Sequence, residues 1–233
     1  MYRVILASTS PRRRDLLRLL ISSFQIRTSA VEEEGSDLFP ETTLPPLPLP
    51  EGFLVPPESD PRLWAWRKAM DVATSHPVLA EGDLILGADT IVTSRERVLG
   101  KPRNLDEARE MLLLLRGTDH YVLTGYTLLQ NRNGHPATLH TGAEATCVVV
   151  RAFSDEELQG YVVSGEPLDK AGAYALQGKG SKLVASVEGC ATNVVGLPVC
   201  RVRSLLTEAG TPVLPYPVEG YCVACLGQPM VNL

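Results

Sequence analysis

Residues 4–20 have the sequence VILASTSPRRRDLLRLL, which joins an apolar segment to a basic helix start. Val4–Ala7 predicts a buried strand, and Ser10 followed by Pro11 is typical of a helix N-cap and first helical position. Arginines fill residues 12–14 in the first turn, where the partial positive charge of a helix disfavours cations. Two interpretations of this stretch are evenly matched: an exposed basic helix start, or an anion site built from backbone N–H groups, hydroxyls and guanidiniums.

The 233-residue chain is 44% hydrophobic and 21% charged, which is typical of a soluble globular protein with a sizeable core. Its formal net charge of −5 argues against a nucleic-acid or membrane partner, since both favour basic proteins. No apolar run approaches a signal peptide or the ~18–20 residues of a membrane helix, so we expect a cytoplasmic protein. Cys222 and Cys225 lack a second pair at zinc spacing, so we expect no metal or redox function there.

Residues 35–61 are rich in proline and contain scattered leucine, valine and phenylalanine side chains. Proline removes a backbone donor and fixes φ, which excludes a central strand or a helix from most of this segment. The apolar side chains favour an extended arm lying on a surface over a free solvated linker. We therefore interpret the segment as an insertion within one domain.

Residues 84–94, LILGADTIVTS, predict a central strand with Asp89 embedded in it. Strand interiors are depleted in aspartate, and a buried carboxylate needs a cation, a metal or hydrogen bonds to offset its desolvation. A functional interpretation of Asp89 is therefore favoured over a structural one. Glu33 lies in an acidic run that otherwise indicates a solvated turn, and Lys68 lies on a predicted helix where a solvated lysine is the commoner case.

Periodicity and turn residues predict the remaining elements. Asn133-Gly134 predicts a hairpin turn, Ser154 with Glu157 predicts a capping box, and the glycine-rich loop 166–180 would let backbone approach a ligand closely. The predicted helices cover residues 61–75, 105–116, 154–165 and 199–209, and the predicted strands cover 24–30, 120–130, 143–153 and 183–187.

Several separate motifs together resemble the Maf family of nucleoside triphosphate pyrophosphatases, once named septum-formation proteins. They are SxSPRR at 8–13, GADTIV at 87–92, GKP at 100–102, DHYVLTG at 119–125, SGEPLDKAGAYALQG at 164–178 and NVVGLP at 193–198. The resemblance implies an α/β fold with an elongated mixed β-sheet, flanking helices and two lobes around a central cleft, related in architecture to the inosine triphosphate pyrophosphatases. It implies one catalytic domain over residues 1–209, with the insertion at 35–61 inside it and an irregular tail at 210–233.

The resemblance also implies a reaction, in which a nucleoside triphosphate and water give the monophosphate and pyrophosphate with a divalent cation, Mg²⁺ or Mn²⁺. Ser8, Ser10, Arg12 and Arg13 would hold phosphate, and Lys68 and Lys101 would neutralise its developing charge. Asp89 would be either the general base or a metal ligand, and Glu33 would bind the metal or the attacking water. Arg12, Thr90 and Gln177 would set nucleobase specificity.

The residues Ala88-Asp89-Thr90 resemble the subgroup that acts on dTTP and UTP, whereas a second subgroup, acting on 7-methyl-GTP, carries Asp-Gln there. We therefore expect pyrimidine triphosphates as substrates, and normal and modified nucleotides both stay open. The alternative is a non-catalytic nucleotide-binding regulator of septum formation, but a phosphate binder has no use for carboxylates that repel the anion. A phosphatase releasing orthophosphate is a third class. Oligomeric state stays open, with a homodimer as one option.

Overall fold

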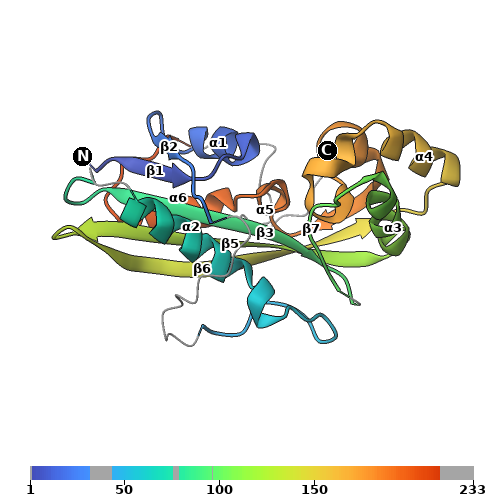
Figure 1. The fold of residues 1–233 in the computed structure, drawn as a ribbon, viewed down its shortest axis with the longest axis horizontal. Helices are drawn as coiled ribbons and strands as arrows, with labels where there is room; N and C mark the ends of the chain where they lie inside the picture. Colours follow the sequence, from blue (N-terminus) through green and yellow to red (C-terminus); the bar gives the residue numbers. More distant parts are fainter. Residues whose placement is uncertain (1, 32–43, 76–78, 96, 216–233) are drawn as a thin grey trace.

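A computed structural model describes residues 2–31, 44–75, 79–95 and 97–215 (Figure 1). Glu33, Cys222 and Cys225 lie outside these described residues. The strands are β1 (Val4–Ala7), β2 (Gln25–Arg27), β3 (Leu84–Thr93), β4 (Val98–Leu99), β5 (Asp119–Arg132), β6 (His135–Val150) and β7 (Val184–Glu188). The α-helices are α1 (Pro11–Arg18), α2 (Pro61–Ser75), α3 (Leu105–Leu115), α4 (Asp155–Val163), α5 (Ala191–Val195) and α6 (Val199–Glu208). Short 3₁₀ helices are η1 (Pro57–Ser59), η2 (Glu166–Asp169), η3 (Ala171–Ala173) and η4 (Gly178–Leu183).

The described strands form one mixed sheet in the order β2-β1-β3-β5-β6-β7, with β4 paired to β3. β1 runs parallel to β2 and β3, and the strands from β3 to β7 pair antiparallel along the sheet order. The predicted turn between β5 and β6 is confirmed, because Asn133 and Gly134 have φ of 52° and 79°. Both strands extend to this turn, beyond their predicted ends, because backbone pairing continues where residues 131–142 lack a clear apolar alternation.

Helices cover both faces of the sheet, as the alternation of side chains along β3 requires. Leu84 and Leu86 belong to a core with α1 and α6, whereas Ile85 belongs to a separate core under α2. Val92, further along β3, contributes to a third core with α3 and α4. Figure 1 shows α1 and α6 over one part of an elongated molecule and α3 and α4 at its other end. This architecture confirms the expected α/β fold with a mixed sheet and flanking helices.

The local signals for helix ends agree well with the structure. Ser10 caps α1 by accepting a hydrogen bond from the Arg13 backbone N–H, and Pro11 is the first residue of the helix. Ser154 and Glu157 form the predicted capping box of α4.

β2 is shorter than predicted, with three residues. Among the described residues, none of the helices has the length and apolar character that crossing a membrane requires.

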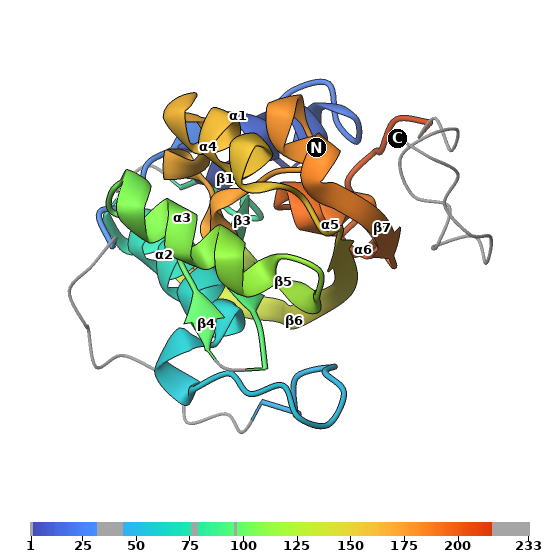
Figure 2. The same ribbon diagram turned by 90° about the vertical axis from the view of Figure 1, so that its right-hand side faces the viewer.

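Residues 44–56, which we call the proline arm, follow the surface without forming a helix or strand. Phe53 anchors the arm, since it is buried and its ring meets Tyr121 edge-on at a centroid distance of 4.8 Å. The Thr93 hydroxyl donates to the Leu54 carbonyl at 3.1 Å, and Arg62 donates to the Pro45 carbonyl at 2.6 Å. In Figures 1 and 2 the arm lies on the opposite side of the molecule from α1 and α4.

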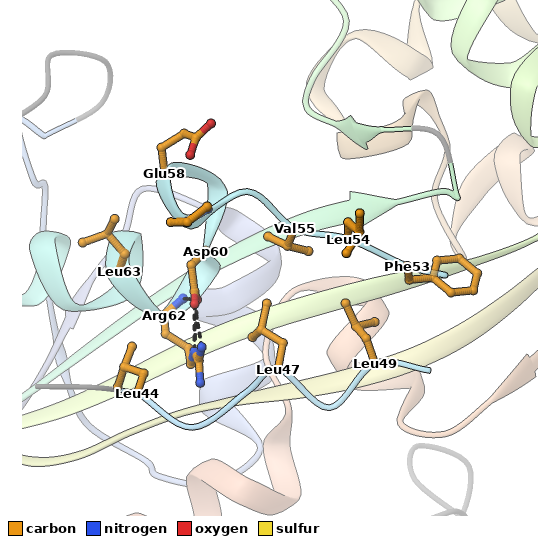
Figure 3. Close-up of a pocket in the computed structure, with 11 residues that line it drawn as sticks. Leu44, Leu47, Leu49, Phe53, Leu54, Val55, Glu58, Asp60, Arg62 and Leu63 are labelled. Atoms are coloured by element: carbon orange, nitrogen blue, oxygen red, sulfur yellow. Dashed lines mark hydrogen bonds and ion pairs between the residues drawn. The ribbon is translucent and has the colours of Figure 1, made fainter. Parts of the chain in front are cut away.

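A pocket of about 650 Å³ lies between the proline arm and the start of α2 (Figure 3). Its wall is mainly apolar, and the buried Arg62 guanidinium in it is paired with Asp60. The apolar lining residues are Leu44, Leu47, Leu49, Phe53, Leu54, Val55, Pro57 and Leu63. None of the predicted site residues in the described part of the chain lines this pocket.

Candidate active site

A second cavity, of about 500 Å³, opens where β1 ends beside the longer β3. The parallel pairing of the two strands stops at Ala7 opposite Gly87, and β3 continues to Thr93. Residues 8–10 and the N-terminus of α1 therefore lie beside the uncovered part of β3. Ligands bind outside the carboxyl ends of strands in open α/β sheets, and helix N-termini favour anions.

The cavity gathers every predicted site residue that the structure describes. They are Ser8, Ser10, Arg12, Arg13, Lys68, Asp89, Thr90, Lys101 and Gln177. Glu33 lies outside the described residues, so its predicted role stays a prediction. Arg14 does not line the cavity and pairs instead with Asp15 at 3.4 Å.

Lys68 and Asp89 form an ion pair within the cavity wall. The Lys68 Nζ lies 2.8 Å from the Asp89 Oδ1, and the two side chains are only 16% and 18% exposed. Asp89 lies on β3 and Lys68 on α2, so the pair depends on how closely that helix approaches the sheet. This carboxylate thus has the compensating cation that its burial requires.

Two glycines allow α2 to approach the sheet at backbone distance. A Cβ added at Gly87 would lie 2.0 Å from the Ala65 carbonyl oxygen, and one at Gly125 would lie 2.2 Å from the Pro61 carbonyl carbon. Gly125 on β5 is directly opposite Asp89 in the strand register. The glycines of the GADTIV and DHYVLTG motifs therefore set the helix height that brings Lys68 to Asp89.

Arg13 is fixed by contacts to three segments of the chain. Its guanidinium donates to the Thr90 hydroxyl and the Gly196 carbonyl, each at 2.9 Å, and to the Ser8 hydroxyl at 3.4 Å. Burial lowers the pKa of Arg13, and the nearby Asp89 carboxylate opposes that change. The guanidinium is thus held at the cavity wall before any ligand arrives.

The Thr90 hydroxyl already donates its proton to a neighbouring side chain. The Thr124 hydroxyl donates to the Asn193 carbonyl at 2.9 Å, so across the 3.0 Å contact to Thr90 it must accept. Thr90 therefore donates to Thr124 while accepting from Arg13, and only its acceptor capacity remains for a ligand.

Positive charge dominates the cavity wall among the described residues. Five cationic side chains line it, Arg12, Arg13, Lys68, Lys101 and Lys170, against two carboxylates, Asp89 and Asp169. Lys101 is exposed, and the structure records no hydrogen bond or ion pair for it within the described part of the chain. Such a concentration of cations suits a ligand carrying several negative charges.

Asp169 and Lys170 are cavity residues to which sequence reasoning assigned no role. Arg12 reaches across to Asp169, donating from Nη1 to the carboxylate Oδ2 and from Nη2 to the backbone carbonyl, both at 3.2 Å. A usable signal was present, because an adjacent acid and base stand among small residues in the loop 166–180.

The described donor set fits a Mg²⁺ ion only as a partial site. Asp89 offers carboxylate oxygens, and Mg²⁺ in phosphate-binding enzymes is usually held by one or two carboxylates together with substrate oxygens. Among the described residues there is no cluster of three or more His, Cys, Asp or Glu side chains that could hold a metal alone. A bound phosphate chain would therefore have to complete the coordination.

Most of the sequence matches a known protein family. The model of a family described as Maf-like protein matches residues 3–209. The chain belongs to this family. A protein of Pelotomaculum thermopropionicum named dTTP/UTP pyrophosphatase is 41% identical over 214 residues, covering 92% of this chain and 100% of the relative. One of Carboxydothermus hydrogenoformans with the same name is 40% identical over 208 residues, covering 89% and 99%. The predicted family resemblance is thereby confirmed.

The DHYVLTG motif of this Maf-like chain places His120 in full burial behind the cavity. Its Nε2 lies 2.6 Å from the hydroxyl of Tyr174, a cavity-lining residue, and its Nδ1 has no hydrogen-bond partner among the described residues. Burial lowers the pKa of His120 from 6.5 to about 4, although Asp119 opposes the change. His120 therefore has a hydrogen-bond partner at only one of its two ring nitrogens among the described residues, and it stays neutral at physiological pH.

This burial predicts a loss of stability in mild acid. Between pH 6.5 and 4 the unfolded chain binds a proton at His120 that the folded chain excludes, so the free energy of unfolding falls as the pH is lowered. The contribution is on the order of 3 kcal/mol across that range. Denaturant unfolding at several pH values should show a shallower decline in His120→Gln, while His135→Gln, at an exposed histidine, should follow wild type. Equal slopes in all three proteins would contradict the prediction.

Proposed function

We propose that this member of the Maf-like family is a nucleoside triphosphate pyrophosphatase that converts dTTP and UTP to their monophosphates and pyrophosphate. The observation that carries the proposal is the Lys68–Asp89 pair set in the wall of a predominantly cationic cavity. Cations and a helix N-terminus alone would suit a passive phosphate site. A half-buried carboxylate held among them by Lys68 favours hydrolysis, because it repels the anion and can accept a proton from water. The names of the relatives support the same reaction.

The phosphate chain would bind at the N-terminus of α1. Arg12 and Lys101 can reach non-bridging oxygens, and Arg13 presents a guanidinium already oriented by its three contacts. The Ser10 and Ser8 hydroxyls accept hydrogen bonds from the backbone at 3.4 and 3.2 Å, which orders the turn that would surround the phosphate. These groups would stabilise the charge that develops on the departing pyrophosphate.

Asp89 would serve as the general base. It would take a proton from a water molecule as the water oxygen bonds to the α-phosphorus. The bond from the α-phosphorus to the oxygen that bridges the α- and β-phosphates breaks, and that oxygen leaves with pyrophosphate. Lys68 would keep the carboxylate oriented for this step. A divalent cation, Mg²⁺ or Mn²⁺, would be held by Asp89 with Glu33 as the predicted second ligand, and would supply further neutralisation of phosphate charge.

Nucleobase selection is assigned to Arg12, Thr90 and Gln177. Thr90 has only acceptor capacity left, so it suits a hydrogen-bond donor such as the imide N–H that thymine and uracil share. Gln177 is exposed at the cavity wall, where its amide can both donate and accept. On this proposal the substrate is a free nucleotide of the cytoplasm and needs no nucleic-acid or membrane partner. The homodimer stays a prediction.

A comparison of nucleotides tests the proposed substrate class. Chromatography should detect monophosphate formed from dTTP and UTP with Mg²⁺ or Mn²⁺, at rates at least about tenfold above those for dATP and dGTP. EDTA should abolish turnover of every nucleotide. Equal rates for purines and pyrimidines would contradict the base assignment, and undiminished turnover in EDTA would contradict the metal assignment.

A further inference from the structure

Asp169 connects the two sides of the cavity through Arg12. Arg12 lies on α1, whose apolar residues belong to the core with α6, whereas Asp169 ends η2, which adjoins α3 and α4. The guanidinium donates to both the carboxylate and the backbone carbonyl of Asp169, each at 3.2 Å. A nucleotide in the cavity would therefore meet Arg12 already engaged with an internal anion.

The same carboxylate also holds a second cation of the cavity. Lys170 Nζ lies 2.5 Å from Asp169 Oδ1 and 2.7 Å from the Glu166 carbonyl oxygen. Asp169 thus forms ion pairs with two cationic side chains that line the cavity, Arg12 and Lys170, as a phosphate group would.

The Arg12–Asp169 pair is more exposed to solvent than the Lys68–Asp89 pair, the other ion pair described in the cavity wall. The Asp169 side chain is 68% exposed and Arg12 is 33% exposed, whereas Asp89 and Lys68 are 18% and 16% exposed. Exposed ion pairs contribute little to stability, because water screens both charges. The Arg12–Asp169 pair can therefore be exchanged at small cost, whereas Lys68–Asp89 is a fixed part of the wall.

We propose that Asp169 is an exchangeable counterion, which holds Arg12 until a phosphate group of the nucleotide displaces it and which reclaims Arg12 as pyrophosphate leaves. The inference rests on the proposed function, since it assigns the displacing anion to that reaction. A phosphate carries more charge than a carboxylate and accepts the guanidinium fork equally well, so the exchange favours phosphate. Competition from Asp169 weakens binding of both substrate and product, and so assists product release.

Titration calorimetry with inorganic pyrophosphate as the probe tests this exchange without turnover. At fixed Mg²⁺ concentration, Asp169→Asn should bind pyrophosphate about tenfold more tightly than wild type, because Arg12 no longer has an anionic partner. Asp169→Ser should shift affinity in the same direction. Asp155→Asn is the matched control, since Asp155 pairs with Arg116 at 2.7 Å with exposures of 71% and 30% and lies outside the cavity. Its affinity should equal that of wild type.

A double-variant cycle separates exchange from simple charge repulsion. With Arg12→Ala in the background, Asp169→Asn should lose much of its effect on affinity, because the competition for Arg12 is gone and only the pairing of Asp169 with Lys170 remains. A gain that persists undiminished there, an unchanged affinity in Asp169→Asn, or weaker binding in that variant would each overturn the exchange. Failure of wild type itself to bind pyrophosphate would instead contradict the phosphate site of the proposed function.

Discussion

Asp89→Asn is expected to lower kcat for dTTP hydrolysis by between about 10²- and 10⁴-fold, the range typical of losing a general base. The amide has nearly the same shape and can still accept a hydrogen bond from Lys68, now 2.8 Å from Asp89 Oδ1, so the fold should be retained. What disappears is the carboxylate that is proposed to accept the proton of the attacking water. Initial rates of pyrophosphate release at saturating dTTP measure the effect, and thermal unfolding checks the fold.

Asp119→Asn is the matched control for this change. Asp119 is also a strand carboxylate paired with a cation, Arg95 at 2.7 Å, but it does not line the cavity. Its kcat should stay within about twofold of wild type. If Asp89→Asn also keeps its activity within that range, Asp89 is not the base.

Gly125→Ala is expected to lower the free energy of unfolding by about 3 kcal/mol, the upper end for an overpacked core. The new Cβ would lie 2.2–2.3 Å from the Pro61 carbonyl group and the Arg62 nitrogen, all backbone atoms that cannot turn away. Helix α2 must then move off the sheet. Because Lys68 lies on that helix and Asp89 is opposite Gly125, activity should fall even in the fraction that stays folded.

Gly160→Ala is the control for Gly125→Ala, because the same substitution is expected to change stability in the opposite direction there. Gly160 lies in α4, and an added Cβ there would meet nothing within 4 Å. Alanine has the higher helix propensity, so this variant should be more stable than wild type by up to about 1 kcal/mol. Denaturant unfolding of the two variants should therefore give shifts of opposite sign. Equal stability of Gly125→Ala and wild type would show that α2 is not held at backbone contact.

Signals that act over a few residues predicted much of the fold. The Ser10-Pro11 start of α1, the Asn133-Gly134 turn and the bounds of α2 at 61–75 all follow from local backbone and capping preferences. β6 was predicted only from residue 143 onward, because its first residues are held by pairing with β5 and not by an apolar alternation. Pairing between strands is a long-range property, which a local pattern does not contain.

The same difference between local signals and long-range contacts applies to the candidate site. Asp89 could be singled out from its own chemistry, as an acid within an apolar strand, and the resemblance to the Maf-like family supplied the other predicted site residues, but not the roles of Asp169 and Lys170. The hydrogen bonds and ion pairs that those residues form with one another were not predictable from the sequence. Thr90 is committed to Arg13 and Thr124, and Arg12 is shared with Asp169, through bonds between segments 34 to 157 residues apart. Such contacts depend on how the helices are placed on the sheet.

Phosphorus NMR of the products of dTTP tests the central claim most directly. With wild-type protein and Mg²⁺, we predict that dTMP and pyrophosphate appear in equal amounts and that no orthophosphate accumulates, because the proposed reaction is attack of water at the α-phosphorus. Formation of dTDP with orthophosphate would place the chain among the phosphatases. Binding of dTTP without any product would make the cavity that of a nucleotide-binding regulator, and either result would contradict the pyrophosphatase.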